Sequence, residues 1–376
     1  MRRYLHVLVV AGALAVSPHA VAAQAAQSEP IIQQTFAESE DGWMVFMGNG
    51  KVSVTHDPTE LRGGKGALKF TYNIAKGEVN LMALPTPGGK LAHMKSLRCW
   101  VKADYGTTLA FAIQESGGGR YVAPFSVPGG KWQEVVLALG DFVLSEDKDA
   151  PKDPDGKLDP DQAMGIAVID LAQIAAQAGD NPLVAALFPY QPGAHTLLMS
   201  DFTVSDQPVP ASVAASATGV DIDTFAHPQV CWIGVGGAKL ARVDGGPIGG
   251  PSLKMDYHAG PTSGGGVLKP VSRGALAGTN RIEFDIASAK PTKVFVQLEQ
   301  PGGIKFNAAA DLDGGSAKQH VVLSASSFAP AQDSSDPSAK LDFAQVTTVL
   351  IGDITGVLGG VEQDNTLWIG KLRAVK

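Results

Sequence analysis

The chain has 376 residues and a formal net charge of −7, with a pI near 5.6. This length is enough for two or three domains, and the acidic balance offers no basic surface for nucleic acid or anionic lipid. The 44 glycines and 24 prolines exceed average usage, which predicts many turns and few helices.

The N-terminal residues 1–23 have the pattern of a secretory signal peptide. Arg2 and Arg3 precede the apolar run Leu5–Val16, and small residues then offer a cleavage site. No later apolar run approaches the roughly 20 residues that a membrane-spanning helix needs. We therefore predict an exported protein, periplasmic or secreted and without a membrane span, that begins with a mobile leader at residues 24–33.

The rest of the sequence contains an internal repeat. Residues 66–130, shifted by 185 positions, align without a gap on residues 251–315. Apolar residues alternate with others over short runs, and glycine-rich turns separate the runs, as is typical of β-strands. The stretch Arg98–Phe142 and its copy are each predicted to form a β-hairpin, and the repeat predicts two similar domains.

The two predicted domains cover residues 34–206 and 221–376. Residues 207–220 between them have the Pro-, Ser- and Ala-rich composition of a linker. Each domain holds about eight short strands, which predicts an all-β fold of two tandem antiparallel β-sandwiches. Helix is predicted only in an insertion of the first domain, at Leu171–Gln177 and Pro182–Leu187.

Alternation along the strands predicts which side chains form the core. Successive side chains of a strand point to opposite faces, so one set shares the buried side of the first domain. This set is Leu97, Cys99, Val101, Leu109, Phe111 and Ile113. Four tryptophans are also predicted to pack inside: Trp43, Trp132, Trp232 and Trp368.

The two cysteines leave alternatives open. Cys99 aligns with Phe284 of the second copy and so holds a core position, while Cys231 lies beside Trp232. Core positions favour two free, apolar thiols, whereas export permits a disulfide between the two halves.

Several motifs together resemble a known family. They are the opening Phe36 and Trp43, the run Lys131–Phe142, Lys-Leu-Asp at 157–159 and the closing run Asn365–Ile369. They resemble galactose-binding-domain-like jelly rolls, and are most similar to carbohydrate-binding modules and to the complex I intermediate-associated protein 30 type. The resemblance covers nearly all of the mature chain in two copies. It implies tandem jelly-roll modules that bind glycans without catalysis.

The resemblance also implies a structural Ca²⁺ near the first strand of a domain. Asp201 matches the family's acidic position in the first domain, and Glu38 is the candidate partner in the opening strand. In the second domain the matching place is Lys371, and an ammonium group opposes a bound cation. The acidic loop Glu146–Asp161 is predicted to be a solvated, mobile loop, with weak Ca²⁺ binding as the alternative.

The outward face of the central hairpin and its neighbour is the candidate ligand surface. A sugar site needs an aromatic plate, with planar amide, carboxylate or guanidinium groups for paired hydroxyls. The candidates are Arg98, Trp100, Gln114 and Arg120 in the first domain, and Phe295, Gln297, Glu299, Lys305 and Asn307 in the second. The alternative is an ordinary solvated or packing face, with Glu299 and Lys305 as a cross-strand ion pair. Trp100 is either exposed and functional or covered by the inserted helix.

Signatures of an enzyme are missing from the sequence. It contains no Gly-x-Ser-x-Gly, Walker A or His-Glu-x-x-His motif. We therefore predict an exported, non-catalytic protein that binds carbohydrate. The alternative is a structural or assembly partner in an envelope or secreted protein complex. An isolated aromatic ringed by polar groups would favour sugar, and a wide apolar patch would favour protein.

Overall fold

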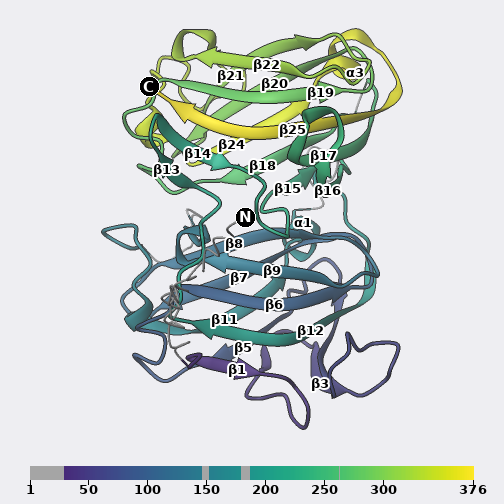
Figure 1. Ribbon diagram of the computed structural model, residues 1–376, viewed down its shortest axis with the longest axis vertical. Helices are drawn as coiled ribbons and strands as arrows, with labels where there is room; N and C mark the ends of the chain where they lie inside the picture. The colour runs from purple at the N-terminus through teal and green to yellow at the C-terminus, as the bar shows by residue number, and fades with distance from the viewer. Residues whose placement is uncertain (1–28, 146–151, 179–186, 262) are drawn as a thin grey trace, which may run out of the picture.

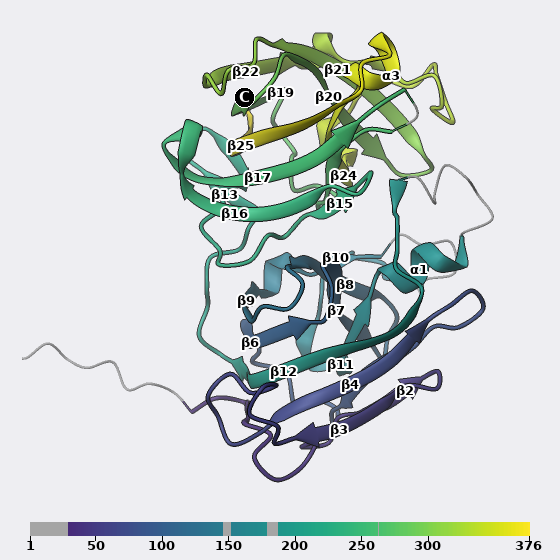
Figure 2. The same cartoon turned by 90° about the vertical axis from the view of Figure 1, so that its right-hand side faces the viewer.

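The computed structural model describes residues 29–145, 152–178, 187–261 and 263–376. The predicted signal peptide lies outside these residues, as do residues 24–28 of the predicted leader, residues 146–151 of the acidic loop and most of the predicted helix Pro182–Leu187. The regular secondary structure of the described chain is nearly all β-strand, and Figures 1 and 2 show two lobes stacked along the long axis of the molecule. The predicted all-β fold of two tandem antiparallel sandwiches is confirmed.

The first module is a sandwich of two antiparallel, six-stranded sheets. Sheet A contains, in spatial order, β3 (Lys51–Thr55), β4 (Ala67–Ile74), β12 (Gly193–Ser205), β6 (Ser96–Ala103) and β9 (Gln133–Ala138), with β1 (Ile32–Gln34) also paired to β12. Sheet B contains β10 (Val143–Leu144), β8 (Arg120–Val127), β7 (Thr107–Glu115), β11 (Ala163–Asp170), β5 (Leu81–Pro85) and β2 (Met44–Met47).

The second module repeats this arrangement. Sheet C contains β13 (Ala214–Ser216), β14 (Gly219–Asp223), β25 (Gln363–Val375), β17 (Gly250–Ala259) and β16 (Lys239–Gly245), with β19 (Arg281–Ser288) bridging β25 and β22 (Gln319–Ser324). Sheet D contains β15 (Ile233–Val235), β18 (Gly266–Pro270), β24 (Thr348–Asp353), β20 (Thr292–Gln300), β21 (Ile304–Leu312) and β23 (Ala329–Pro330).

Helical segments are short and lie at the ends of strands. The predicted helix Leu171–Gln177 is confirmed as α1 (Ala172–Gln177), and α3 (Thr355–Gly359) follows β24. The 3₁₀ turns are η1 (Leu139–Asp141), η2 (Pro160–Gln162), η3 (Gly246–Ile248), η4 (Ala325–Ser327) and η5 (Phe343–Gln345). None of the described helices has both the length and the apolar character required to cross a membrane.

Each module has its own hydrophobic core between its two sheets. All six side chains predicted to share the buried side of the first module are at most 1% exposed, so strand alternation located the core correctly. Trp43 and Trp232 are buried as predicted. Trp368 is instead partly exposed on the outer side of sheet C, because its neighbours Leu367 and Ile369 take the inward positions of β25. Trp132, just before β9, is also only partly buried.

The predicted central hairpin is only partly correct. β7 and β8 form a hairpin, and β20 and β21 form its copy. β6, however, pairs with β12 and β9 of sheet A, whereas β7 belongs to sheet B. The chain therefore crosses from one sheet to the other after Ala103. As a consequence, the outward side chains of β6 and β7 lie on opposite faces of the module.

A short segment of the second module completes the first. We call Pro228–Trp232 the junction segment. The side-chain amide of Gln229 pairs with the main chain of Val136 on edge strand β9, accepting from its N–H at 3.1 Å and donating to its carbonyl at 2.6 Å. Val230 bridges to Ser126 on β8, whose N–H donates to the Val230 carbonyl at 2.8 Å. Edges of both sheets of the first module are thereby covered.

The connection between the modules is shorter than the predicted linker at residues 207–220. Residues 214–216 form β13 and residues 219–220 begin β14, and both strands belong to sheet C. Ser212, in the remaining stretch, is buried. The connection between the modules is therefore part of the folded structure.

Both cysteines are free and buried, so the structure contains separate thiols and no bridge between the halves. Cys99 on β6 points into the first core. Cys231 belongs to the junction segment and packs against that same core. Burial raises the pKa of the Cys231 thiol to about 12, so the group stays a neutral, apolar packing element near neutral pH.

Candidate functional site

The outer side of sheet D brings together the five residues predicted for the second module. Phe295, Gln297 and Glu299 alternate along β20 with fully buried apolar residues. Asn307 lies directly opposite Gln297, and Lys305 directly opposite Glu299, on β21. Because cross-strand partners share a face, these side chains form one surface, which we call the sheet D face.

An amide pair lies at the centre of the sheet D face. Gln297 Nε2 donates to Asn307 Oδ1 at 2.9 Å. This bond fixes both planar groups, and it leaves Gln297 Oε1 free to accept and Asn307 Nδ2 free to donate. On the other side of β20, Gln297 lies opposite Leu350 of β24, which is next to Leu268 of β18. The amide pair therefore has an apolar neighbour as well as an aromatic one.

The aromatic neighbour is Phe295, whose ring is partly exposed beside Gly352. A Cβ on Gly352 would come within 2.6 Å of Phe295 Cε1, so a larger residue on β24 would displace the ring. The glycine lets the ring lie close to the sheet. An aromatic ring held in this way offers an apolar surface beside polar groups.

Glu299 has no partner on this face, although a lysine lies opposite it. Lys305 Nζ binds Asp333 Oδ2 at 2.6 Å instead, so the expected Glu299–Lys305 ion pair is not formed. The Glu299 carboxylate makes no hydrogen bond or ion pair with any residue that the structure describes. Burial raises the pKa of this carboxyl, Lys305 opposes the rise and Asp333 adds to it.

The four residues predicted for the first module do not form one face. Arg98 and Trp100 lie on the outer side of sheet A, and Gln114 and Arg120 lie on the outer side of sheet B. The prediction of a single surface is wrong because β6 and β7 belong to different sheets. Trp100 is partly exposed, and a loop arginine lies over its ring: the Arg62 Cζ atom is 3.5 Å from the ring centroid. A ligand-binding role of Trp100 stays a prediction.

The internal repeat shows what the first module lacks. At the positions that match Phe295, Gln297 and Asn307, sheet B carries Ala110, Ala112 and Val122. Gln114 matches Glu299, and its Nε2 donates to the carbonyl of Gly119 at 2.7 Å. At these positions sheet B therefore has neither the aromatic ring nor the amide pair of sheet D.

The two predicted Ca²⁺ ligands do not come together with a third acidic group. Asp201 Oδ2 accepts from Arg62 Nη1 at 3.1 Å, and Glu38 is exposed. Within the described residues, no group of three histidine, cysteine, aspartate or glutamate side chains is placed to hold a metal ion. A structural Ca²⁺ in the first module stays a prediction from the family resemblance.

The described part of the acidic loop packs against the first module. Glu115 Oε1 accepts from the Asp159 N–H, and Tyr121 donates its hydroxyl hydrogen to Asp153. In the second module the matching glutamine, Gln300, accepts from the Asp342 N–H at 2.8 Å. Because a neutral amide performs this task in the copy, the contact that Glu115 makes with the loop is structural.

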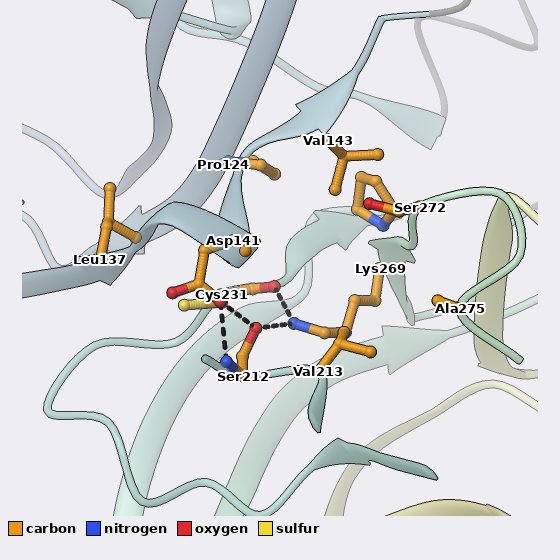
Figure 3. Close-up of a pocket in the computed structure, with 12 residues that line it drawn as sticks. Pro124, Leu137, Asp141, Val143, Ser212, Val213, Cys231, Lys269, Ser272 and Ala275 are labelled. Carbon is orange, nitrogen blue, oxygen red and sulfur yellow. Dashed lines mark hydrogen bonds between the residues drawn. The ribbon is translucent and has the colours of Figure 1, made fainter. Parts of the chain in front are cut away.

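A buried polar cluster at the junction of the modules was not predicted. Lys269 is 3% exposed, and its Nζ donates to Ser212 Oγ at 3.0 Å and to the Cys231 carbonyl at 3.2 Å. Ser212 in turn donates through N and Oγ to Asp141. Figure 3 shows this chain of bonds beside a cavity of about 210 Å³. The polar groups satisfy one another, so the cluster holds the linker against both modules.

A second buried network, a tyrosine bonded to an aspartate, occurs in both modules and could have been found from the internal repeat. Tyr72 donates to Asp170 at 2.7 Å in the first module, and Tyr257 donates to Asp353 at 2.5 Å in the second. Burial, followed by the nearby carboxylate, raises the pKa of both tyrosines, so both hydroxyls remain protonated donors. The tyrosines are 185 positions apart, which is the spacing of the repeat. The paired donors and acceptors make these groups structural.

Comparison with known proteins gave matches among solved structures alone. No protein-family model matches the chain, and no curated protein matches it. Similar solved structures include a family 11 carbohydrate-binding module from Clostridium thermocellum in complex with a β-1,3-1,4-mixed-linked tetrasaccharide, at 17% identity and a TM-score of 0.34 over 43% of this chain and 97% of that one. The tandem CBM22-1–CBM22-2 domain of Paenibacillus barcinonensis Xyn10C covers 93% of this chain and 99% of its own, at 14% identity and a TM-score of 0.29. TmCBM61 in complex with β-1,4-galactotriose matches at 12% identity and a TM-score of 0.29, over 47% of this chain and 98% of that one.

Proposed function

We propose that the chain is an exported, non-catalytic protein that binds carbohydrate through the sheet D face. The observation that carries this proposal is the row formed by Phe295, the Gln297–Asn307 amide pair and the unpartnered Glu299. It combines one partly exposed aromatic ring with fixed planar polar groups on a rigid hairpin. An isolated aromatic ringed by polar groups is the arrangement that suits a sugar ring.

Recognition would need no covalent step. The apolar side of a sugar ring would stack on Phe295, and hydroxyl groups would donate to Gln297 Oε1 and Glu299 while accepting from Asn307 Nδ2. Because the amide pair is already formed in the free protein, little side-chain freedom would be lost on binding.

Replacing Phe295 by alanine should lower glycan affinity by about tenfold or more, because the stacking surface is removed while the fold is kept. A glycan array followed by titration calorimetry measures this. Phe46→Ala is the matched control, because Phe46 is 66% exposed on the other module and far from the sheet D face in sequence and fold. If the wild-type protein binds no glycan on the array, the proposal is abandoned.

An assembly role is the second candidate function, and the edge strand β2 favours it. Met44, Phe46 and Met47 are 51%, 66% and 49% exposed, and β2 lies at the end of sheet B, where its one partner among the described strands is β5. An apolar edge strand can pair with another chain, and a second copy would supply the same strand in antiparallel orientation. Phe46→Asp is then expected to shift the protein from dimer to monomer in analytical ultracentrifugation. A wild-type protein that sediments as a monomer at all concentrations would contradict this role.

A further inference from the structure

Glu299 is a carboxylate that makes no hydrogen bond or ion pair with any of the described residues. Its side chain is partly buried on β20, and a lysine lies opposite it on β21. A carboxylate removed from water is unfavourable unless an opposite charge or hydrogen-bond donors compensate it. Asp333 holds the ammonium of that lysine, so Lys305 stabilises the Glu299 carboxylate only through its charge at a distance, and the pKa of Glu299 stays raised.

The loop after β23 holds Lys305 away from Glu299. Asp333 binds the Lys305 ammonium at 2.6 Å, and Ser334 Oγ accepts from the Lys305 N–H at 3.1 Å. Ser335 Oγ donates to the Gly302 carbonyl at 2.7 Å at the tip of the same hairpin. Three consecutive loop residues therefore fix the hairpin end, and the lysine points its charge at the loop.

The fold itself does not require a carboxylate at this position. In the first module the matching residue is Gln114, a neutral amide that bonds to its own hairpin turn. The two hairpins are otherwise alike in strand pairing and in their glycine-rich turns. Of the two matching positions, only Glu299 thus carries a negative charge, and it lies on the face with Phe295 and the amide pair.

We propose that Glu299 recognises a positive charge on the ligand. The sheet D face would then prefer amino sugars with a free ammonium group. This inference rests on the proposed carbohydrate-binding function and narrows its ligand class. An ammonium beside Glu299 would form a charge-assisted hydrogen bond, and Gln297 Oε1 would offer it a second acceptor. An N-acetylated sugar would lose the charge, and a uronic acid would bring a second carboxylate against Glu299.

Titration calorimetry with three oligosaccharide probes tests the inference on the full chain. The probes are hexamers of glucosamine, N-acetylglucosamine and galacturonic acid at about pH 6, where amino groups of this kind remain protonated. We expect the glucosamine hexamer to bind at least about tenfold more tightly than its N-acetylated form, and galacturonic acid to bind most weakly. E299Q should abolish the difference between the first two probes, because the affinity for the glucosamine hexamer falls to the level of the N-acetylated one.

D333N is the second variant, because it acts on Glu299 without altering it. Freed from Asp333, Lys305 can pair with Glu299 across the hairpin, and the preference for glucosamine should fall. Lowering the pH through the raised pKa of Glu299 should reduce the preference too, because protonation removes the charge. Among the described residues, the charged groups that act on Glu299 are Lys305 and Asp333.

The outcomes separate this inference from the function on which it rests. Equal affinities for glucosamine and N-acetylglucosamine, or a preference that survives E299Q, would overturn the role of Glu299 and leave carbohydrate binding intact. Failure of all three probes and of every neutral glycan on the array would overturn both. A uniform loss with Phe295→Ala, at an unchanged ratio between probes, supports the assignment of stacking to Phe295 and charge selection to Glu299.

Discussion

Replacing Asp223 by alanine is expected to lower the free energy of unfolding by about 3–5 kcal/mol. Asp223 Oδ2 accepts from Trp232 Nε1 at 2.9 Å and lies 3.5 Å from Lys269 Nζ. Asp223 and Lys269 are each 3% exposed. The substitution therefore leaves a buried ammonium without its neighbouring carboxylate and a buried indole N–H without an acceptor. Urea denaturation of the full chain measures the loss.

The internal repeat supplies a matched control for this prediction. In the first module Gln34 Oε1 accepts from Trp43 Nε1 at 2.9 Å, in the same arrangement but without a charge. Gln34→Ala should therefore cost only about 1–2 kcal/mol, the usual effect of removing one partner of a buried hydrogen bond. Equal losses for the two variants would show that the charge at Asp223 contributes nothing. Asp223→Asn should fall between them.

The two modules are expected to unfold in a single calorimetric transition, in contrast to independent modules on a flexible linker. The junction segment bonds to β8 and to edge strand β9, and Cys231 packs against the core of the first module. Gln229→Ala should lower the free energy of unfolding by about 2–5 kcal/mol, because the buried N–H and carbonyl of Val136 lose their partner. Differential scanning calorimetry should then resolve two transitions.

Gln133→Ala provides the comparison within the same contact. Gln133 Nε2 donates to the Pro228 carbonyl at 3.0 Å, but the side chain is only partly buried, so water can replace the bond. We expect this variant to retain the single transition and to lose under about 1 kcal/mol. Two separate transitions in the wild-type protein would contradict the coupling of the modules.

Much of the fold could be predicted because strand alternation and the repeat are local signals. The six core residues predicted on these strands are all buried, because side chains alternate with a period of two between inward and outward positions. They are Leu97, Cys99, Val101, Leu109, Phe111 and Ile113. Alternation does not, however, identify the partner of a strand. Arg98 and Gln114 were therefore assigned to one face, although β6 and β7 belong to different sheets.

The candidate site was predictable to the extent that it lies within one hairpin. Gln297 and Asn307 are ten positions apart, and the turn between their strands sets their register. The partner of Lys305 lies 28 positions along the chain in a loop, so hairpin geometry gave no indication of it. Arg62 on Trp100 is a contact of the same kind, in which a loop covers a strand residue.

The junction segment also makes the two modules unequal. Among the described residues, the second copy donates this segment and the first receives it, through the Ser126–Val230 bridge on β8 and the Gln229 side chain on β9. If the order of the copies were reversed, or if the first were joined to itself in a longer array, an open side with unpaired peptide groups would remain. The two copies are thus a donor and an acceptor of this segment and are not interchangeable.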